Sequence, residues 1–175
     1  MKIYITLFFL LIVAQSCAQK LSKENEMSRL AAENVIDKYL KNEVKDKNYI
    51  VFSSGDIQFV VLVKDSDSYH EYFIDNSDKG SAYMQDTLFQ SKDELFKKMF
   101  DLDSYHKSYT SFDSEFYKNG YEISSGNITY FALVTKDRAK YGESRLSFYV
   151  KPNPIDAEVY LYFTERLLKW VRSMH

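Results

Sequence analysis

Two short segments of this sequence carry carboxylates and a histidine at spacings that could hold a metal ion. They read DSDSYH at residues 65–70 and DLDSYH at residues 101–106. Carboxylate oxygens and an imidazole nitrogen together are suitable ligands for a divalent metal ion. The candidate ligands are Asp65, Asp67, His70, Asp101, Asp103 and His106.

The same residue types have a second use, in turns and at helix ends. Aspartate and serine side chains form hydrogen bonds with nearby backbone groups, which favours them where the chain reverses. A strand that begins at Tyr69 would also point Tyr69 and His70 to opposite faces of a sheet. We therefore expect turn chemistry at both segments and no cofactor, with a metal site as the alternative.

Motifs of known catalytic chemistry do not occur in the chain. The sequence contains no Gly-x-Ser-x-Gly, no His-Glu-x-x-His, no phosphate-binding loop and no Cys-x-x-Cys. No residue is therefore assigned a catalytic role. A hydrolase or metal-dependent enzyme that uses the aspartate and histidine clusters is the alternative to a non-enzymatic protein.

A tyrosine-rich segment, residues 103–121, shows neither a helical nor a strand period. Tyrosine offers a large contact area together with a polar group, which suits a surface that binds another protein. The candidate residues for such a surface are Tyr105, Tyr109, Phe112 and Tyr117. Alternatively, these rings cover the edge of the sheet between two halves of the domain.

The elements that position these side chains follow from the apolar periodicity. Spacings of three and four residues predict a first helix over 22–44 and a last helix over 156–174. Between them, the runs YIVF, IQFVVLV and SYHEYFI are separated by the breakers SSGD and KDSD, a pattern typical of an antiparallel meander. A short helix fits SKDELFKKMF, with Ser91 as its N-cap.

The second half of the chain repeats part of the first. SSGDIQFVVLVKD at 53–65 aligns with SSGNITYFALVTKD at 124–137, and six of the first eleven positions are identical. Gly55 and Gly126 suit hairpin turns, because glycine reaches positive φ without a steric penalty. Both an internal duplication and two independent hairpins would explain the match.

These elements predict one α+β domain. The expected order is α-β-β-β-α-β-β-β-α, in which LSFYV supplies the last strand. One antiparallel sheet of five to six strands then has the N- and C-terminal helices packed on a face. The abundance of aromatic residues, 15 Tyr and 13 Phe, also favours a sheet.

An export signal is expected at the start of the chain. One basic residue, Lys2, precedes an apolar run over residues 3–13, and small and polar residues follow. This run is too short to span a bilayer, which takes about 20 apolar residues. We predict a signal peptide over 1–16, a linker over 17–21 and a single domain over 22–175.

The end of this segment resembles a bacterial lipoprotein signal peptide, in which a cysteine follows small residues and becomes the acylated first residue. Ala14, Gln15 and Ser16 precede Cys17; Ser16 fits the family pattern, whereas the family favours Leu at the place of Ala14 and a small residue at that of Gln15. The resemblance implies lipidation of Cys17. Ordinary secretory cleavage after Ala18 is the alternative.

The charge balance limits the partners. The chain has 23 Lys and Arg and 25 Asp and Glu, so without Lys2 the mature protein has 22 against 25 and a net charge of −3. This balance excludes the basic surface of a nucleic-acid-binding protein. We expect a cell-envelope protein, held by an N-terminal lipid in the outer or inner membrane and facing the periplasm or the surface, or otherwise secreted. Its domain would bind another protein, for example as an immunity or inhibitor protein.

Overall fold

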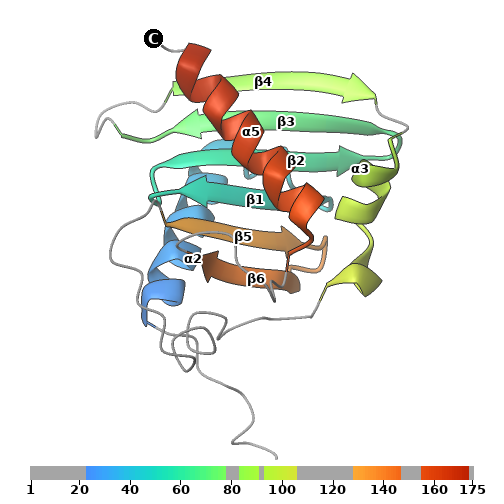
Figure 1. The fold of residues 1–175 in the computed structure, drawn as a ribbon, viewed down its shortest axis with the longest axis horizontal. Coiled ribbons are helices and arrows are strands. Elements are labelled where there is room, and N and C mark those ends of the chain that lie inside the picture. Colours follow the sequence, from blue (N-terminus) through green and yellow to red (C-terminus); the bar gives the residue numbers. More distant parts are fainter. Residues whose placement is uncertain (1–22, 78–82, 91–92, 106–127, 147–154, 174–175) are drawn as a thin grey trace, which may run out of the picture.

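The computed structural model describes residues 23–77, 83–90, 93–105, 128–146 and 155–173 (Figure 1). The helical elements are α2 (Lys23–Val35), the π-helical turn η1 (Ile36–Leu40), α3 (Glu94–Met99), the short η2 (Leu102–Ser104) and α5 (Ala157–Ser173). The strands are β1 (Asn48–Ser54), β2 (Gln58–Asp65), β3 (Ser68–Asp75), β4 (Tyr83–Gln90), β5 (Thr129–Val134) and β6 (Lys140–Leu146). No helix in these ranges is long and apolar enough to cross a membrane.

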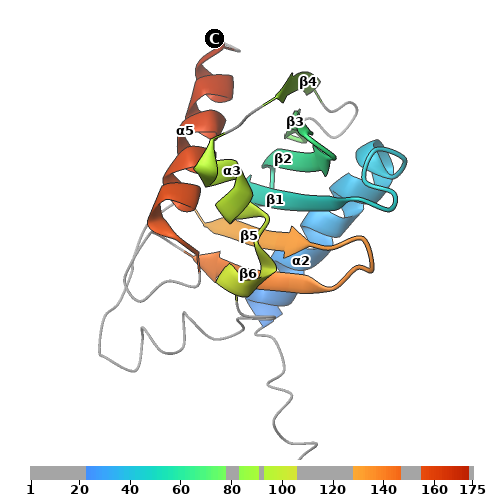
Figure 2. The ribbon, with the colours of Figure 1, turned by 90° about the vertical axis from the view of Figure 1, so that its right-hand side faces the viewer.

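The strands of the described part form one antiparallel sheet in the order β4-β3-β2-β1-β5-β6. Helix α2 and the turn η1 lie on one face, and α5 and α3 lie on the other (Figure 2). The predicted α+β class, with an antiparallel sheet and helices from both ends of the chain packed on it, is confirmed. The architecture is a sheet between two helical layers.

The two long helices cover opposite faces rather than one shared face. The reason lies in the central strands, where apolar residues follow one another without alternation. In β2 the five residues Phe59–Val63 are all buried. Successive side chains of a strand point to opposite faces, so such a run needs cover on both sides.

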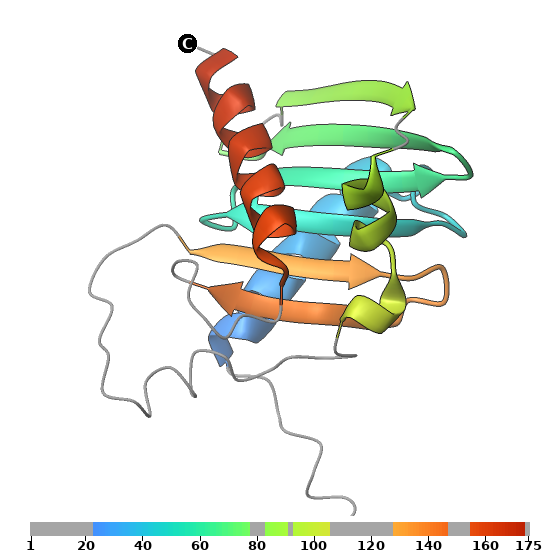
Figure 3. The same cartoon turned by 45° about the vertical axis from the view of Figure 1, so that its right-hand side comes forward.

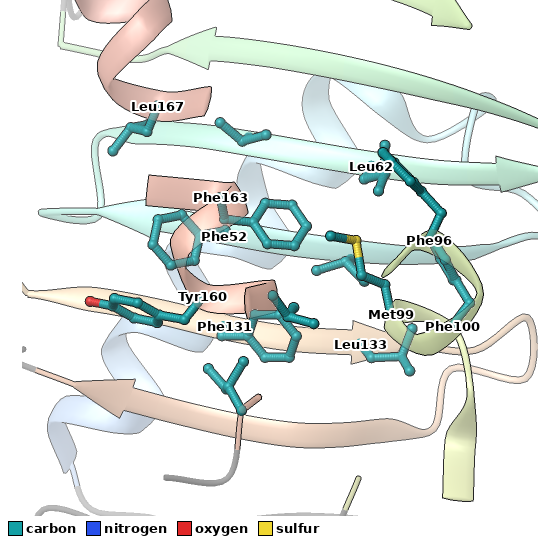
Figure 4. Close-up of a cluster of buried hydrophobic side chains, with 14 of the residues drawn as sticks. Phe52, Leu62, Phe96, Met99, Phe100, Phe131, Leu133, Tyr160, Phe163 and Leu167 are labelled. Atoms are coloured by element: carbon teal, nitrogen blue, oxygen red, sulfur yellow. The ribbon is translucent and has the colours of Figure 1, made fainter. Parts of the chain in front are cut away.

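The core on the α5 side consists largely of aromatic rings (Figure 4). Phe163 of α5 stacks on Phe52 of β1 at a centroid distance of 5.6 Å and meets Phe131 of β5 edge-on at 6.1 Å. Helix α3 lies beside α5 at one end of the strands and adds Phe96 and the fully buried Met99 (Figure 3). These contacts fix α5 across the middle of the sheet.

The strand count on either side of α3 differs from the prediction. Four strands precede α3 and two follow it in the described part, because residues 83–90 form the additional strand β4. Strand β6 begins at Lys140, before the predicted strand LSFYV, most of which lies outside the described residues. Asp93, not the expected Ser91, caps α3 by accepting a hydrogen bond from the Leu95 N–H at 3.0 Å.

The first helix is also shorter than predicted. It changes to π-helical geometry at Ile36 and ends at Leu40, and the next residues form turns. Its buried face consists of Ala32, Val35, Ile36 and Leu40, whereas Met27, at the start of the same apolar pattern, is 60% exposed. The three- and four-residue spacing of apolar residues predicted the helix, whereas its end depended on local geometry.

The two similar segments occupy corresponding places beside β1. Val51 of β1 pairs with Val61 of β2 on one side and with Ala132 of β5 on the other, and these partners are equivalent in the alignment of the segments. The turn before β2 has Gly55 at φ 63° and Asp56 at φ 57°, as predicted for Gly55. The corresponding Gly126 lies outside the described residues.

A β-bulge interrupts the pairing of β5 with β6. The register shifts between Phe131 and Leu133, opposite Gly142, which has φ 58°. Glycine adopts this conformation at little cost, and a bulge of this kind bends the strand and redirects the side chains that follow. Gly142 also makes room for the ring of Tyr105, because a Cβ added to it would lie only 2.7 Å from Tyr105 Cδ1.

Candidate functional site

The first aspartate–histidine segment forms the hairpin between β2 and β3. Asp65 ends β2 and pairs with Lys47 at 2.6 Å, and its backbone carbonyl accepts a hydrogen bond from Ser68 Oγ at 2.9 Å. Ser66 has a positive φ of 54°, and Asp67 lies in the same exposed turn. These contacts are the turn chemistry that the sequence favours.

His70 lies on β3, on the α2 face of the sheet. Its Nδ1 is 2.5 Å from the hydroxyl of Tyr72, while Tyr69 packs in the core on the α5 face. The two neighbours therefore point to opposite faces, as predicted. His70 belongs to a small polar group beside Tyr72, whose hydroxyl also reaches Glu43 at 3.5 Å.

The second segment caps the short helix η2. Asp101 accepts hydrogen bonds from the Asp103 N–H at 3.1 Å and from Ser104 Oγ at 3.2 Å. His106 lies outside the described residues. Within the described ranges, no three histidine, cysteine, aspartate or glutamate side chains lie close enough together to hold a metal ion.

Of the four aromatic residues considered for a partner surface, only Tyr105 lies in the described ranges. Its ring is 8% exposed and packs against Phe131 at a centroid distance of 5.9 Å, beside Gly142. Tyr105 therefore belongs to the core beside β5 and β6. Tyr109, Phe112 and Tyr117 lie outside the described residues.

A buried carboxylate that the sequence analysis missed lies under α5. Glu71 of β3 is fully buried and accepts hydrogen bonds from Arg166 Nε at 2.8 and 2.9 Å, from the Tyr162 hydroxyl at 2.9 Å and from the Trp170 indole N–H at 3.2 Å. The three donors are spaced by four residues and so share one face of α5. Hydrogen bonding to Glu71 raises the pKa of Arg166, and burial beside Glu71 raises the pKa of Tyr162.

A second buried carboxylate lies on the opposite face. Glu143 of β6 is 1% exposed and accepts a hydrogen bond from Arg29 Nε of α2 at 2.5 Å and another from the Tyr130 hydroxyl at 2.9 Å. Hydrogen bonding to Glu143 raises the pKa of Arg29. Each layer of helix is thus joined to the sheet by one glutamate–arginine pair.

These two carboxylates are positioned to hold the helices on the sheet rather than to react with a substrate. A general acid or base needs a carboxyl group that a substrate can reach, and the donors of the protein itself already occupy both groups. A sequence signal for Glu71 did exist. It lies in SYHEYFI in the same phase as Tyr69 and Phe73, so it had to face the core and required partners there.

Strand β4 is the exposed surface that could bind another molecule. It forms one edge of the sheet, with no further strand beside it in the described part (Figure 1). Met84 is 48% exposed and Leu88 is 65% exposed, and the exposed Asp86 lies between them on the same face. The eight residues of β4 pair with β3 in one continuous register, without a bulge, lysine or proline.

The opposite edge, β6, has the features that prevent strand addition. It contains the bulge at Gly142, the inward-pointing charge of Glu143, and Lys140, which pairs with Glu33 at 2.8 Å. Bulges, inward charges and lysines protect an edge against pairing with another chain. Only one of the two edges in the described sheet is therefore open to an additional strand.

Comparisons with protein-family models, curated proteins and solved structures find no match to this chain.

Proposed function

We propose that this chain is an exported cell-envelope protein, anchored through a lipid on Cys17, whose domain binds another protein without catalysis. The proposed binding mode is addition of an extended segment of the partner to the edge of β4. The observation that carries this binding mode is the contrast between the two edges: β6 is protected, whereas β4 pairs without a bulge and exposes Met84 and Leu88. An immunity or inhibitor protein is one form of this function.

The residues of β4 suggest the chemistry of the partner. A second copy of this chain that paired Met84 with Leu88 across a two-fold axis would place its Asp86 directly opposite Asp86 of the first copy. Like charges directly opposite each other destabilise a strand pair, whereas opposite charges and apolar pairs stabilise it. We therefore expect a strand of another protein, with Lys or Arg facing Asp86 and an apolar residue two positions away on each side.

Strand addition suits an open sheet edge such as β4. Main-chain hydrogen bonds along an open edge supply affinity, while alternate side chains supply specificity. On β4 the alternate residues Met84, Asp86 and Leu88 face the α2 side, because they pair with residues of β3 on that face. The same edge would otherwise be a site of aggregation, which an obligate or frequent partner prevents.

Photo-crosslinking in the native envelope tests the docking edge. The full chain would carry a photo-reactive amino acid in place of Leu88, and a control chain would carry it in place of Leu161, which is 57% exposed on α5. We expect one discrete adduct from position 88 and none from position 161. Asp86→Lys in the same chain should reduce the yield of the adduct about tenfold, because it removes an attractive pair and adds a repulsive one.

Two results would contradict this binding mode. An adduct with the mass of two copies of this chain would identify a second copy as the occupant. An adduct whose yield Asp86→Lys does not change would show that the edge makes no charge-specific contact.

Leu88→Lys, which adds an edge charge while keeping the strand exposed, should abolish partner binding without lowering the melting temperature by more than a few degrees.

The lipid anchor has its own test. Cys17→Ser should release the protein from the membrane fraction or leave the precursor uncleaved, because stable anchoring needs the buried acyl chains. Fractionation of cells followed by mass spectrometry of the N-terminus would measure both outcomes. A wild-type protein that is free in solution and begins at Gln19 would exclude lipidation.

A further inference from the structure

A pocket opens under the first helix, on the face of the sheet opposite α5. Its volume is about 240 Å³, and it lies between α2 with η1 and strands β1 and β5, away from the β4 edge. Its floor is buried and largely apolar, formed by Ala32, Ile36, Val51, Val134 and the ring of Tyr130. Its rim carries charged and phenolic groups: Glu33, Asp37, Tyr49, Arg138 and Lys140.

Two unusual backbone conformations lie at this pocket. The first is the π-helical turn Ile36–Leu40, which begins with two of the lining residues. Such turns are rare and frequently occur at functional sites. The second is Arg138, which has φ 64° in the hairpin between β5 and β6. A long side chain at this φ costs about 1 kcal/mol or more relative to glycine; hairpin turns of this domain hold the short side chains of Asp56 and Ser66 there, whereas Arg138 is the long one.

The charged groups of the rim divide into a paired set and an available set. Lys140 forms an ion pair with Glu33 at 2.8 Å. Arg138 is exposed, and its Nη1 lies 3.4 Å from the Tyr49 hydroxyl, so most of its five N–H donors are directed elsewhere. Asp37 is exposed on η1. Burial raises the pKa of Tyr49, and Tyr49, Asp37 and Arg138 all line the pocket.

We propose that this pocket binds a small zwitterionic molecule with an aliphatic body, of the size and chemistry of a branched-chain α-amino acid. Arg138 receives the carboxylate, Asp37 receives the ammonium group, and the aliphatic side chain lies on the apolar floor. A guanidinium group forms strong, paired hydrogen bonds with a carboxylate. The site is independent of the β4 edge and extends the function beyond protein binding.

The size of the pocket supports this class of ligand. Pockets for drug-sized molecules have volumes of roughly 300–1,000 Å³, so a pocket of about 240 Å³ accepts only a smaller body. The floor is aliphatic apart from Tyr130, whose hydroxyl already donates a hydrogen bond to Glu143, so it suits an aliphatic body better than a larger polar ligand. One cation and one carboxylate above such a floor match the two ends of an amino acid.

Titration of the purified folded domain with three related compounds tests the proposal. The compounds are leucine, 4-methylpentanoate, which lacks the ammonium group, and 3-methylbutylamine, which lacks the carboxylate. Amide chemical shifts in the two-dimensional NMR spectrum would report binding. We expect saturable shifts at Ile36, Val51 and Val134 with leucine, and affinities about tenfold or more lower for each analogue, because each loses one charged contact.

Substitutions at the rim separate binding from stability. Arg138→Gly and Arg138→Asn both accept positive φ, so each should keep or raise the melting temperature while lowering the affinity for leucine about tenfold or more. Asp37→Asn should lower it by a similar factor. Lys136→Gln, an exposed change in the same hairpin, is the control and should leave the affinity unchanged.

Three outcomes would overturn the assignment. The first is the absence of saturable shifts with leucine in the wild-type domain. The second is equal affinity for leucine and both analogues, which would indicate binding by the apolar floor alone. The third is an unchanged affinity in both Arg138 variants, which would remove the role of the strained arginine.

Discussion

Arg166→Leu is expected to lower the free energy of unfolding by about 3 to 5 kcal/mol, because it leaves the fully buried Glu71 carboxylate without its cation. The Tyr162 and Trp170 hydrogen bonds cannot neutralise that charge. Denaturant unfolding, followed by tryptophan fluorescence, would measure the loss. The single tryptophan of the chain, Trp170, lies beside this pair and reports on it directly.

A double substitution separates the cost of leaving Glu71 unpaired from the net contribution of the Glu71–Arg166 ion pair. Glu71→Leu with Arg166→Leu should recover most of the loss, since apolar residues of similar size often replace a buried ion pair without net cost. Recovery should be incomplete, because the hydroxyl of Tyr162 and the indole of Trp170 lose their acceptor. Arg172→Leu, an exposed change on the same helix, is the control and should change stability by about 0.5 kcal/mol or less. A loss of similar size in this control would refute the explanation.

Gly142→Ala should destabilise the domain by about 2 to 5 kcal/mol. Two effects add: positive φ costs a non-glycine residue about 1 to 2 kcal/mol, and overpacking costs about 1 to 3 kcal/mol. The added Cβ would lie 2.7 Å from Tyr105 and 3.4 Å from Phe131, and both rings are held in the core. The same denaturant titration would measure the change.

Gly55→Ala is the matched comparison for this glycine. It has a similar φ of 63°, but a Cβ there would meet no atom within 4 Å, so it should lose only the conformational part, about 1 to 2 kcal/mol. Tyr105→Leu, combined with Gly142→Ala, should relieve part of the steric loss. Equal losses of stability at the two glycines would mean that the contact with Tyr105 does not add to the cost of Gly142→Ala.

The buried pair under α5 also bears on the docking edge. Glu71 lies directly opposite Thr87 of β4 in the sheet, so its contacts with α5 hold the strand that supports the proposed binding edge. A rigid edge loses little conformational freedom when a partner strand is added. The Arg166 variant is therefore expected to weaken partner crosslinking at position 88 even under conditions in which the domain stays folded.

Much of the fold could be predicted from local patterns. The strands around YIVF, IQFVVLV and SYHEYFI and both long helices follow from spacing and breakers. Strand β4 was missed because YMQDTLFQ alternates only weakly between apolar and polar residues, as an exposed edge strand does. The pocket beside α2 was missed for another reason. The pocket combines residues from 32–37, 49–51 and 130–140, which only the pairing of β1 with β5 brings together.

The two buried glutamates show most clearly what the sequence by itself determined and what only the tertiary structure decided. Each follows a tyrosine by two residues, Tyr69 before Glu71 and Tyr141 before Glu143, but only Glu71 lies in a strand that the sequence predicts. They nevertheless bind helices on opposite faces of the sheet. The bulge at Gly142 lies between Tyr141 and Glu143 in β6. A one-residue shift in the pairing of β5 with β6 turns the next side chain to the other face of the sheet. At this bulge the ring of Tyr105, which is distant in the chain, packs over Gly142 and leaves no room for a Cβ.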